Sequence, residues 1–236
     1  MNNTSSEVQT FIKKFKKEKL PKGVIYGLAV PFPYIKEVAK GLDTLCLVGA
    51  ENVCFAEKGA YTGEVSASML ADCKMNFCLV GHSERRQFFK ETEAQINQKI
   101  FQLKNNGIIP VLCIGETEKE YKAGKTQEVL QAQLSADLQG VEQKKDFVDI
   151  MIAYEPVWAI GSGQTPTAKD IKKNFTFIKK VLKEILGENE IKVLYGGSVK
   201  SSNAKELLSD EMVDGALVGG ASLVVEDFIN IGRNLI

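Results

Sequence analysis

Two side chains able to do acid–base chemistry end two of the apolar segments of this chain. Glu155 closes a run that begins at Phe147, and His82, the only histidine, follows a shorter run at residues 77–81. A carboxylate at the mouth of an apolar strand is partly desolvated and suited to act as a base near neutrality. A histidine at a helix start is held neutral and can donate to a carbonyl oxygen. A capping carboxylate and a structural or solvated histidine are the alternative interpretations.

A candidate lid comes directly after Glu155. Pro156 and Trp158, the only tryptophan, lead into a Gly-Ser-Gly tail at residues 161–163. Glycines allow such a segment to swing, and a proline stiffens the near side of the hinge. A base followed by a closable segment is an uncommon combination, but an ordinary loop at a strand end has the same composition.

The composition is that of a globular chain. Its 236 residues are 44% hydrophobic and 25% charged, which predicts one domain spanning residues 1–236. The net charge of zero gives no electrostatic case for binding nucleic acid or an anionic membrane. No apolar run approaches the roughly 20 residues of a membrane span. The polar N-terminus lacks a signal-peptide core.

The five cysteines are odd in number and form no Cys-x-x-Cys pair. Several lie in or beside apolar segments, so we expect reduced thiols in a cytoplasmic protein. They are Cys46, Cys54, Cys73, Cys78 and Cys113.

The elements that must position these side chains alternate along the chain. A Thr4-x-x-Glu7 capping box predicts an opening helix, and Thr92, Thr117, Thr167 and Asn203 begin similar patterns. Thr117 starts what we expect to be one long charged helix, and Thr167 starts a helix that reaches Leu186. A last helix is predicted at 223–235. Apolar runs predict strands at 24–30, 45–49, 77–81, 108–114, 147–153, 191–195 and 216–218.

Such alternation predicts an α/β fold with a parallel sheet covered by helices, either doubly wound or closed into a barrel. No Gly-x-Gly-x-x-Gly opens a helix after the first strand, which weakens the dinucleotide-binding alternative. In a barrel, functional groups gather at the carboxyl ends of the strands. His82, Glu155 and the glycine pairs at 196–197 and 219–220 all lie at such ends, which favours the barrel.

Four stretches together resemble the triosephosphate isomerase family. They are residues 80–86, 153–163, 195–199 and 214–222, in the family's order and at roughly its intervals. The resemblance implies a (β/α)8 TIM barrel and the interconversion of dihydroxyacetone phosphate and D-glyceraldehyde 3-phosphate, a step of glycolysis and gluconeogenesis. Glu155 would be the base and neutral His82 the electrophile, through an enediolate. No cofactor or metal is expected.

The resemblance also assigns a phosphate site to Gly161, Ser198, Gly219 and Gly220. Backbone N–H groups at loops and helix starts bind anions without a cationic side chain, although such glycines are often only turns. Glu84 matches the family's glutamate that pairs with a catalytic lysine, and Cys113 a buried cysteine with a packing role.

A homodimer is implied by a second set of matching residues. The loop at residues 60–64 resembles the one that docks into a partner subunit, with Thr62 reaching the partner's active site. Arg85 would pair with Glu64 across that interface. Either charged side chain could equally be a solvated surface residue.

One departure separates this sequence from the family. The family's chains begin with a strand ending in Asn-x-Lys-Met-Asn, whose asparagine and lysine contact the substrate. This chain matches only from Met1 onward, so we expect a barrel without its first strand, N-terminally incomplete because of a truncated or mis-started reading. A catalytically impaired homologue that keeps phosphate binding and dimerisation is the alternative, and a different phosphate-binding barrel, such as an epimerase or aldolase, is a third.

Overall fold

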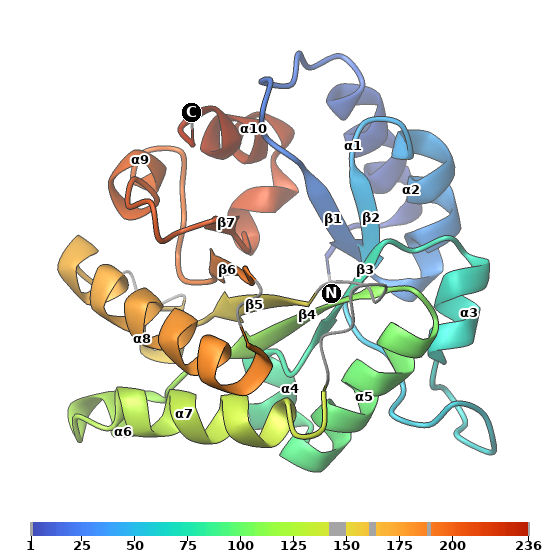
Figure 1. Cartoon of the computed structure of the whole chain (residues 1–236). Helices are drawn as coiled ribbons and strands as arrows, with labels where there is room; N and C mark the ends of the chain where they lie inside the picture. The colour runs from blue at the N-terminus through green and yellow to red at the C-terminus, as the bar shows by residue number, and fades with distance from the viewer. Residues whose placement is uncertain (1, 142–149, 161–163, 188–189, 236) are drawn as a thin grey trace.

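The computed structural model describes residues 2–141, 150–160, 164–187 and 190–235. Its centre is a curled sheet of seven parallel strands, each hydrogen-bonded to the next in chain order, with helices on the outside (Figure 1). This confirms the predicted architecture of a (β/α)8 barrel that lacks one strand, with β1 and β7 as the edges of the described sheet. The strands are β1 (Gly27–Val30), β2 (Leu47–Ala50), β3 (Phe77–Val80), β4 (Ile109–Ile114), β5 (Met151–Tyr154), β6 (Lys192–Tyr195) and β7 (Gly215–Ala216).

Helices follow the strands and cover the convex face of the sheet (Figure 1). The α-helices are α1 (Ser5–Phe15), α2 (Ile35–Leu42), α3 (Ala67–Asp72), α4 (Ser83–Phe88), α5 (Glu93–Asn105), α6 (Glu118–Lys122), α7 (Thr126–Asp137), α8 (Ala168–Leu186), α9 (Ala204–Leu207) and α10 (Val225–Arg233). Three short 3₁₀ turns are η1 (Phe32–Tyr34), η2 (Val157–Ala159) and η3 (Gly220–Leu223).

The capping patterns locate most helix starts. Thr92 and Thr117 each form the predicted reciprocal capping box, and the Thr167 hydroxyl accepts from the Asp170 N–H at 3.2 Å. The opening helix also begins directly after Thr4, as expected. These starts are encoded within four residues, so the sequence alone predicts them.

Two helix predictions are wrong. The segment after Thr117 is not one long helix but two, because Gly124 adopts a left-handed φ of +70° between α6 and α7 and ends the first of them. Asn203 precedes α9 without capping it. Its side chain instead accepts from the Lys200 N–H at 2.7 Å and donates to the Ser198 carbonyl at 3.2 Å, which folds the loop after β6. Helices α2 and α3 were not predicted at all.

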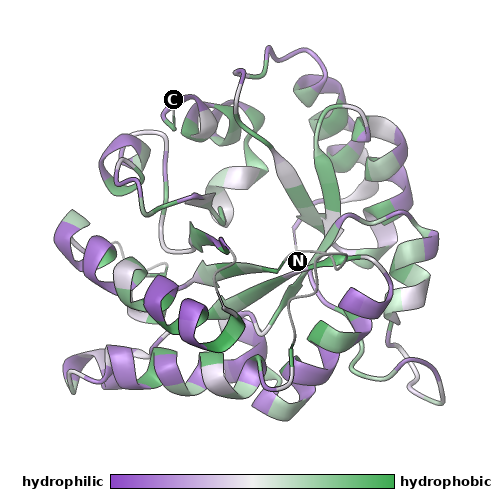
Figure 2. Ribbon diagram, viewed as in Figure 1, coloured by the Kyte–Doolittle hydropathy of each residue, from purple (hydrophilic) through white to green (hydrophobic). Residues whose placement is uncertain are grey.

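Alternation along the strands builds two apolar layers. On β3, β4 and β5, Phe77, Leu79, Val111, Cys113 and Ala153 form one cluster on the concave side. The intervening residues, such as Cys78, Leu112 and Ile152, join a larger cluster with the helices. Strands buried on both faces are therefore apolar throughout, as Figure 2 shows, while the outer helix faces are hydrophilic.

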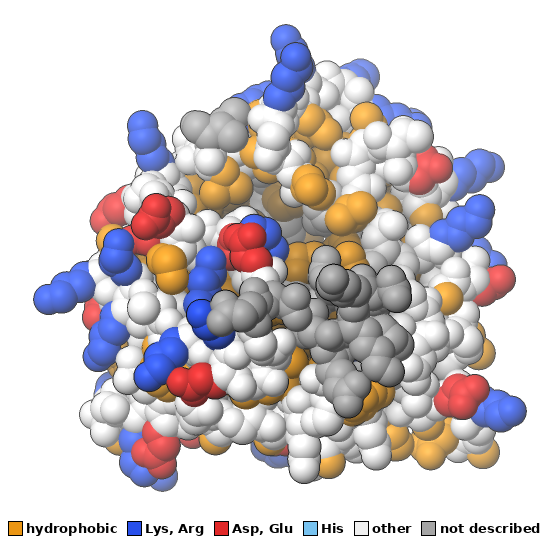
Figure 3. Space-filling model, in the orientation of Figure 1, with side chains coloured by type: hydrophobic (Ala, Val, Ile, Leu, Met, Phe, Trp, Pro, Cys, Tyr) orange, Lys and Arg blue, Asp and Glu red, His pale blue; other side chains and the backbone are white. Residues whose placement is uncertain are grey.

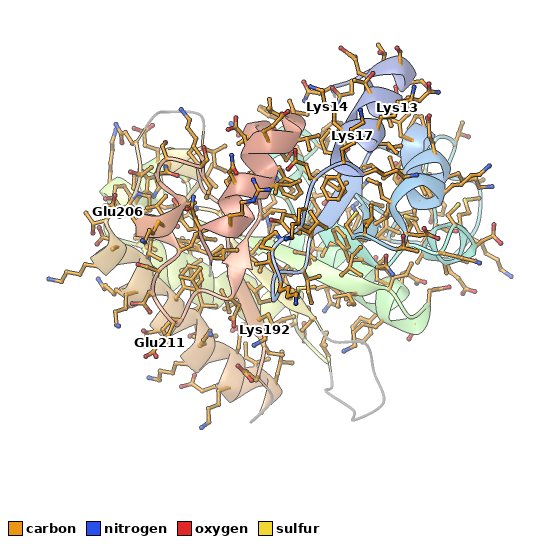
Figure 4. All side chains as sticks on the ribbon, turned by 90° about the horizontal axis from the view of Figure 1, so that it is seen from above. Lys13, Lys14, Lys17, Lys192, Glu206 and Glu211 are labelled. Carbon is orange, nitrogen blue, oxygen red and sulfur yellow. The ribbon has the colours of Figure 1, made fainter. Side chains whose placement is uncertain are left out.

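The C-terminal helix α10 packs beside the start of β1. Tyr26, which is buried, donates its hydroxyl to the Ile229 carbonyl at 2.9 Å and packs edge-on against Phe228. It also meets Phe15 of α1, so the first and last helices share one contact residue. Charged side chains lie around the outside, with Lys13 and Lys14 of α1 and Lys17 just beyond it on the side away from Glu206 and Glu211 (Figure 4).

No helix within the described ranges is long and apolar enough to cross a membrane.

Candidate active site

Glu155 lies directly after β5 and is almost completely buried, with 2% of its surface exposed. Its backbone N–H donates to the Ile114 carbonyl at 2.7 Å, which continues the pairing of β5 with β4 by one residue. Each carboxylate oxygen faces one donor. Oε1 is 3.0 Å from His82 Nε2, and Oε2 accepts from the Ser83 N–H at 3.0 Å. The structure therefore brings the two sequence-predicted groups into direct contact.

His82 is the N-cap of α4, and its Nδ1 accepts from the Glu84 N–H at 3.3 Å. An acceptor role for Nδ1 places the proton of a neutral imidazole on Nε2, the atom that faces Glu155. Burial lowers the pKa of His82, but the hydrogen bond and negative charge of Glu155 outweigh it and leave the pKa above its ordinary value. The start of α4 favours the expected neutral form of the His82 imidazole, because Nδ1 accepts a backbone N–H there. The adjacent Glu155 carboxylate favours the protonated form instead.

Two glycines make room for Glu155. A Cβ added to Gly115, at the end of β4, would lie 1.7 Å from the Glu155 carbonyl oxygen. A Cβ on Gly196, at the end of β6, would lie 2.8 Å from Cγ of Glu155. The neighbouring strand ends therefore approach this residue from both sides more closely than any side chain permits.

Glu84 and Cys113, the two supporting residues of the sequence analysis, both lie near this pair. Glu84 keeps an exposed carboxylate 3.9 Å from His82 Nδ1. Cys113 is fully buried on β4, and burial together with the charge of Glu155 raises the pKa of its thiol. The thiol is thus a neutral, buried group beside the carboxylate.

The segment following Glu155 is anchored by a buried acid. Glu116, which is fully buried, accepts from the indole N–H of Trp158 at 2.8 Å and from the Tyr154 hydroxyl at 3.2 Å. Tyr121 stacks on Trp158 with ring centroids 4.1 Å apart. These contacts hold the start of the predicted lid. Its glycine-rich part, residues 161–163, lies outside the described residues.

The predicted phosphate residues lie at neighbouring strand ends. Ser198 follows β6, and its hydroxyl donates to the Ala159 carbonyl at 2.9 Å, which links it to the lid segment. Gly219 and Gly220 follow β7, and a Cβ on either would meet no atom within 4 Å, so the space beside them is open. Gly161, the fourth predicted residue, lies outside the described residues. Figure 3 views the opposite end of the sheet, where Lys192 begins β6, and shows apolar side chains nearer the middle and charged ones mostly around the rim.

The predicted dimer residues occupy two surface regions. Thr62 and Glu64 are exposed on the loop between β2 and α3. Arg85 lies on α4, where its Nε donates to Glu91 Oε1 at 2.5 Å and its guanidinium covers the Phe89 ring. Within the chain, Arg85 is thus already paired with a different glutamate from the one expected across an interface.

Several residues around the site were missed by the sequence analysis. Glu116, Asn174 and Arg86 make buried or half-buried contacts to residues far away in the chain. No short motif marks Glu116 or Asn174, and the motif at residues 80–86 contains Arg86 without indicating its partners. Gly115 had a usable signal, because it ends an apolar strand run as the glycines of the other motifs do. Among the residues that the structure covers, no group of three or more His, Cys, Asp or Glu side chains is arranged to hold a metal ion.

Comparison with known proteins agrees with this arrangement. The profile of the triosephosphate isomerase family matches residues 1–235. The chain belongs to the triosephosphate isomerase family. The triosephosphate isomerase of Mycoplasma mobile is 41% identical over 237 residues, covering 98% of this chain and 95% of the relative. That of Alkaliphilus metalliredigens is 39% identical over 235 residues, covering 98% and 94%, and that of Dictyoglomus turgidum is 42% identical over 241 residues, covering 99% and 96%.

The contact between Glu155 and His82 can be tested directly by replacing the carboxylate. In Glu155→Gln the carboxylate that most raises the pKa of His82 is gone while burial and the weaker effects of Glu84 and Glu51 remain, so the pKa of His82 should fall. Because His82 is the only histidine, a single imidazole resonance reports its titration by NMR.

The stability change has a defined sign. A histidine whose pKa is raised in the folded state adds stability that is complete below the unfolded value and is lost as the pH rises through the folded value. As the pH rises above the pKa of His82, the free energy of unfolding of the wild type should fall by this contribution. That of Glu155→Gln should not fall in this way. An unchanged pKa of His82 in this variant would show that the contact is not the cause.

Proposed function

We propose that this chain interconverts dihydroxyacetone phosphate and glyceraldehyde 3-phosphate through an enediolate, with Glu155 as the base and His82 as the electrophile. The contact between the buried Glu155 carboxylate and His82 Nε2, at the carboxyl ends of the strands, is the observation that carries this proposal. Membership of the triosephosphate isomerase family supplies the substrate class.

The two groups suit the two halves of an aldose–ketose isomerisation. The base must remove a proton from the carbon beside the carbonyl group, and the electrophile must stabilise the oxygen that becomes negative. The Nε2–H of His82, which now faces Oε1, is the donor that a substrate carbonyl oxygen would take over. Oε2 would keep its hydrogen bond from Ser83, so the carboxylate stays oriented while Oε1 is released toward the carbon.

The phosphate would bind to backbone N–H groups at Gly161, Ser198, Gly219 and Gly220. Open space beside Gly219 and Gly220 supports this assignment, as does the position of Ser198 on the neighbouring strand end. The hydrogen bond from the Ser198 hydroxyl to the Ala159 carbonyl connects the phosphate loop to the segment after Glu155. Binding of phosphate would act on the lid through this contact.

Turnover of both trioses by the purified 236-residue chain tests the proposal. Loss of a general base should lower kcat about 100- to 10,000-fold in Glu155→Gln. Glu118→Gln, which removes an exposed carboxylate paired with Lys122 on α6, should keep wild-type kcat. A folded wild-type chain without turnover would contradict the proposal and favour the impaired homologue. Turnover of other sugar phosphates instead would favour a different barrel enzyme.

We also propose a homodimer of a cytoplasmic protein. The loop carrying Thr62 and Glu64 exposes Tyr61, and α4, which carries Arg85, leads into two further exposed aromatic side chains, Phe88 and Phe89. Exposed aromatic groups of this kind favour a partner surface. The five cysteines are all free, four of them buried, which fits a reducing compartment.

A charge in the proposed interface should separate the subunits. Tyr61→Arg should weaken self-association at least about fivefold, because truncation or charge at a buried aromatic anchor costs more than about 1 kcal/mol. Ile25→Arg changes an equally apolar, more exposed side chain outside the proposed interface and serves as the control. Sedimentation equilibrium measures both. A monomeric wild type, or equal association of both variants, would contradict the dimer.

A further inference from the structure

Arg86 cross-links the ends of two strands beneath the Glu155–His82 pair. Its Nε donates to the Gly81 carbonyl at 2.7 Å, directly after β3, and its Nη2 donates to the Cys113 carbonyl at 3.2 Å on β4. The side chain is only 15% exposed although it starts on the second turn of the short helix α4. A guanidinium that bonds two strand ends at once acts as a rigid brace between them.

Each of the two braced carbonyls lies next to one member of the pair. Gly81 immediately precedes His82 and adopts a left-handed φ of +68°. A Cβ there would lie 2.9 Å from Arg86 Nη2, so this turn is packed against the guanidinium. Cys113 precedes Ile114, whose carbonyl accepts the Glu155 N–H at 2.7 Å. Movement of the guanidinium would therefore alter the backbone on both sides of the 3.0 Å contact.

Two carboxyl groups hold the guanidinium from the opposite side. Asp137 of α7, which is fully buried, accepts from Nη2 at 2.7 Å, and Glu93 of α5 accepts from Nη1 at 2.5 Å. Burial first and then Glu93 raise the pKa of Asp137 to about 8, whereas the pKa of Glu93 is lowered. Two carboxylates beside one guanidinium would leave a net negative charge, and the raised pKa of Asp137 works against that charge. A reduced net charge suits a half-buried location.

We propose that Arg86 is a positioning residue for the isomerase reaction, setting the orientation of His82 toward Glu155 by bracing the Gly81 and Cys113 carbonyls. Glu93 and Asp137 keep its guanidinium in place. The inference rests on the proposed function for its consequence in catalysis, but its consequence for the geometry of His82 does not depend on turnover.

If the role of Arg86 were purely structural, its removal would not change the hydrogen bonds of the His82 imidazole. If Arg86 only joined α4, α5 and α7 to the sheet, its removal would lower the free energy of unfolding and nothing else. If it positions His82, its removal must change the hydrogen bonds of the imidazole. The readouts that separate these roles are the tautomer and the pKa of the single histidine.

The experiment compares the wild type with Arg86→Lys, Arg86→Met and Glu93→Gln. Arg233→Met, which removes an exposed guanidinium paired with Glu18, is the matched control. Histidine NMR should show the Nε2–H tautomer in the wild type and the control. It should show a mixture of tautomers and a shifted pKa of His82 in Arg86→Met. Lysine keeps the charge but cannot bond both carbonyls, so Arg86→Lys should behave in the same way.

Kinetics supply the second readout. A small displacement of a catalytic group costs up to about 100-fold in rate, so kcat should fall about 10- to 100-fold in both Arg86 variants with KM within about twofold. Glu93→Gln leaves the arginine in place, removes one of its partners and should give a smaller change of the same kind. This variant decides the matter if the Arg86 variants do not fold.

Unchanged tautomer and pKa of His82 in the folded variants would overturn the inference, whatever happens to stability. A wild-type chain without turnover would count against the proposed function alone, since the NMR comparison would still decide whether Arg86 positions His82.

Discussion

The structure depends above all on a carboxylate held inside the protein with one donor for each oxygen. Glu155 is buried, and an isolated buried carboxylate would cost several kcal/mol unless it were paired or hydrogen-bonded. His82 and the Ser83 N–H meet that requirement. Both donors come from the strand end and helix start after β3, so the base cannot be in place unless β3 and α4 are in place too.

Parallel topology makes this contact possible. Ser83 and Glu155 are 72 residues apart, but in a sheet whose strands run parallel in chain order their strand ends meet at one edge. The two flanking glycines let β4 and β6 approach, and the two apolar layers fix the curvature that turns this edge inward. The charge of this site is oriented by two hydrogen-bond donors, His82 Nε2 and the Ser83 N–H.

Features that depend on a few neighbouring residues could be predicted from the sequence. Helix starts at Thr92, Thr117 and Thr167 depend on four consecutive residues, and their prediction is confirmed. The position of Glu155 at a strand end is equally local. The interruption of the long helix at Gly124 was missed because a lone glycine inside a charged helical pattern is often tolerated.

Contacts between distant segments were beyond prediction. Arg86 and Asp137 are 51 residues apart, and only the folding of the whole chain brings the two side chains together. Arg85, in the motif at residues 80–86, is expected to pair with Glu64 across a subunit interface, and within its own chain it bonds Glu91. The motif gives the residue type but not its nearest carboxylate. The charge of His82 was incompletely predicted for a related reason, because the helix start is local and the opposing carboxylate is not.

Isotope exchange in D2O tests the central assignment of Glu155 as the base most directly. A carboxylic acid formed by taking a carbon-bound proton exchanges with solvent, so triose phosphate recovered after partial turnover should carry deuterium at the carbon beside the carbonyl group. The account predicts this incorporation with the wild type and its loss with Glu155→Gln. Turnover without deuterium incorporation, or incorporation that persists in the variant, would contradict it.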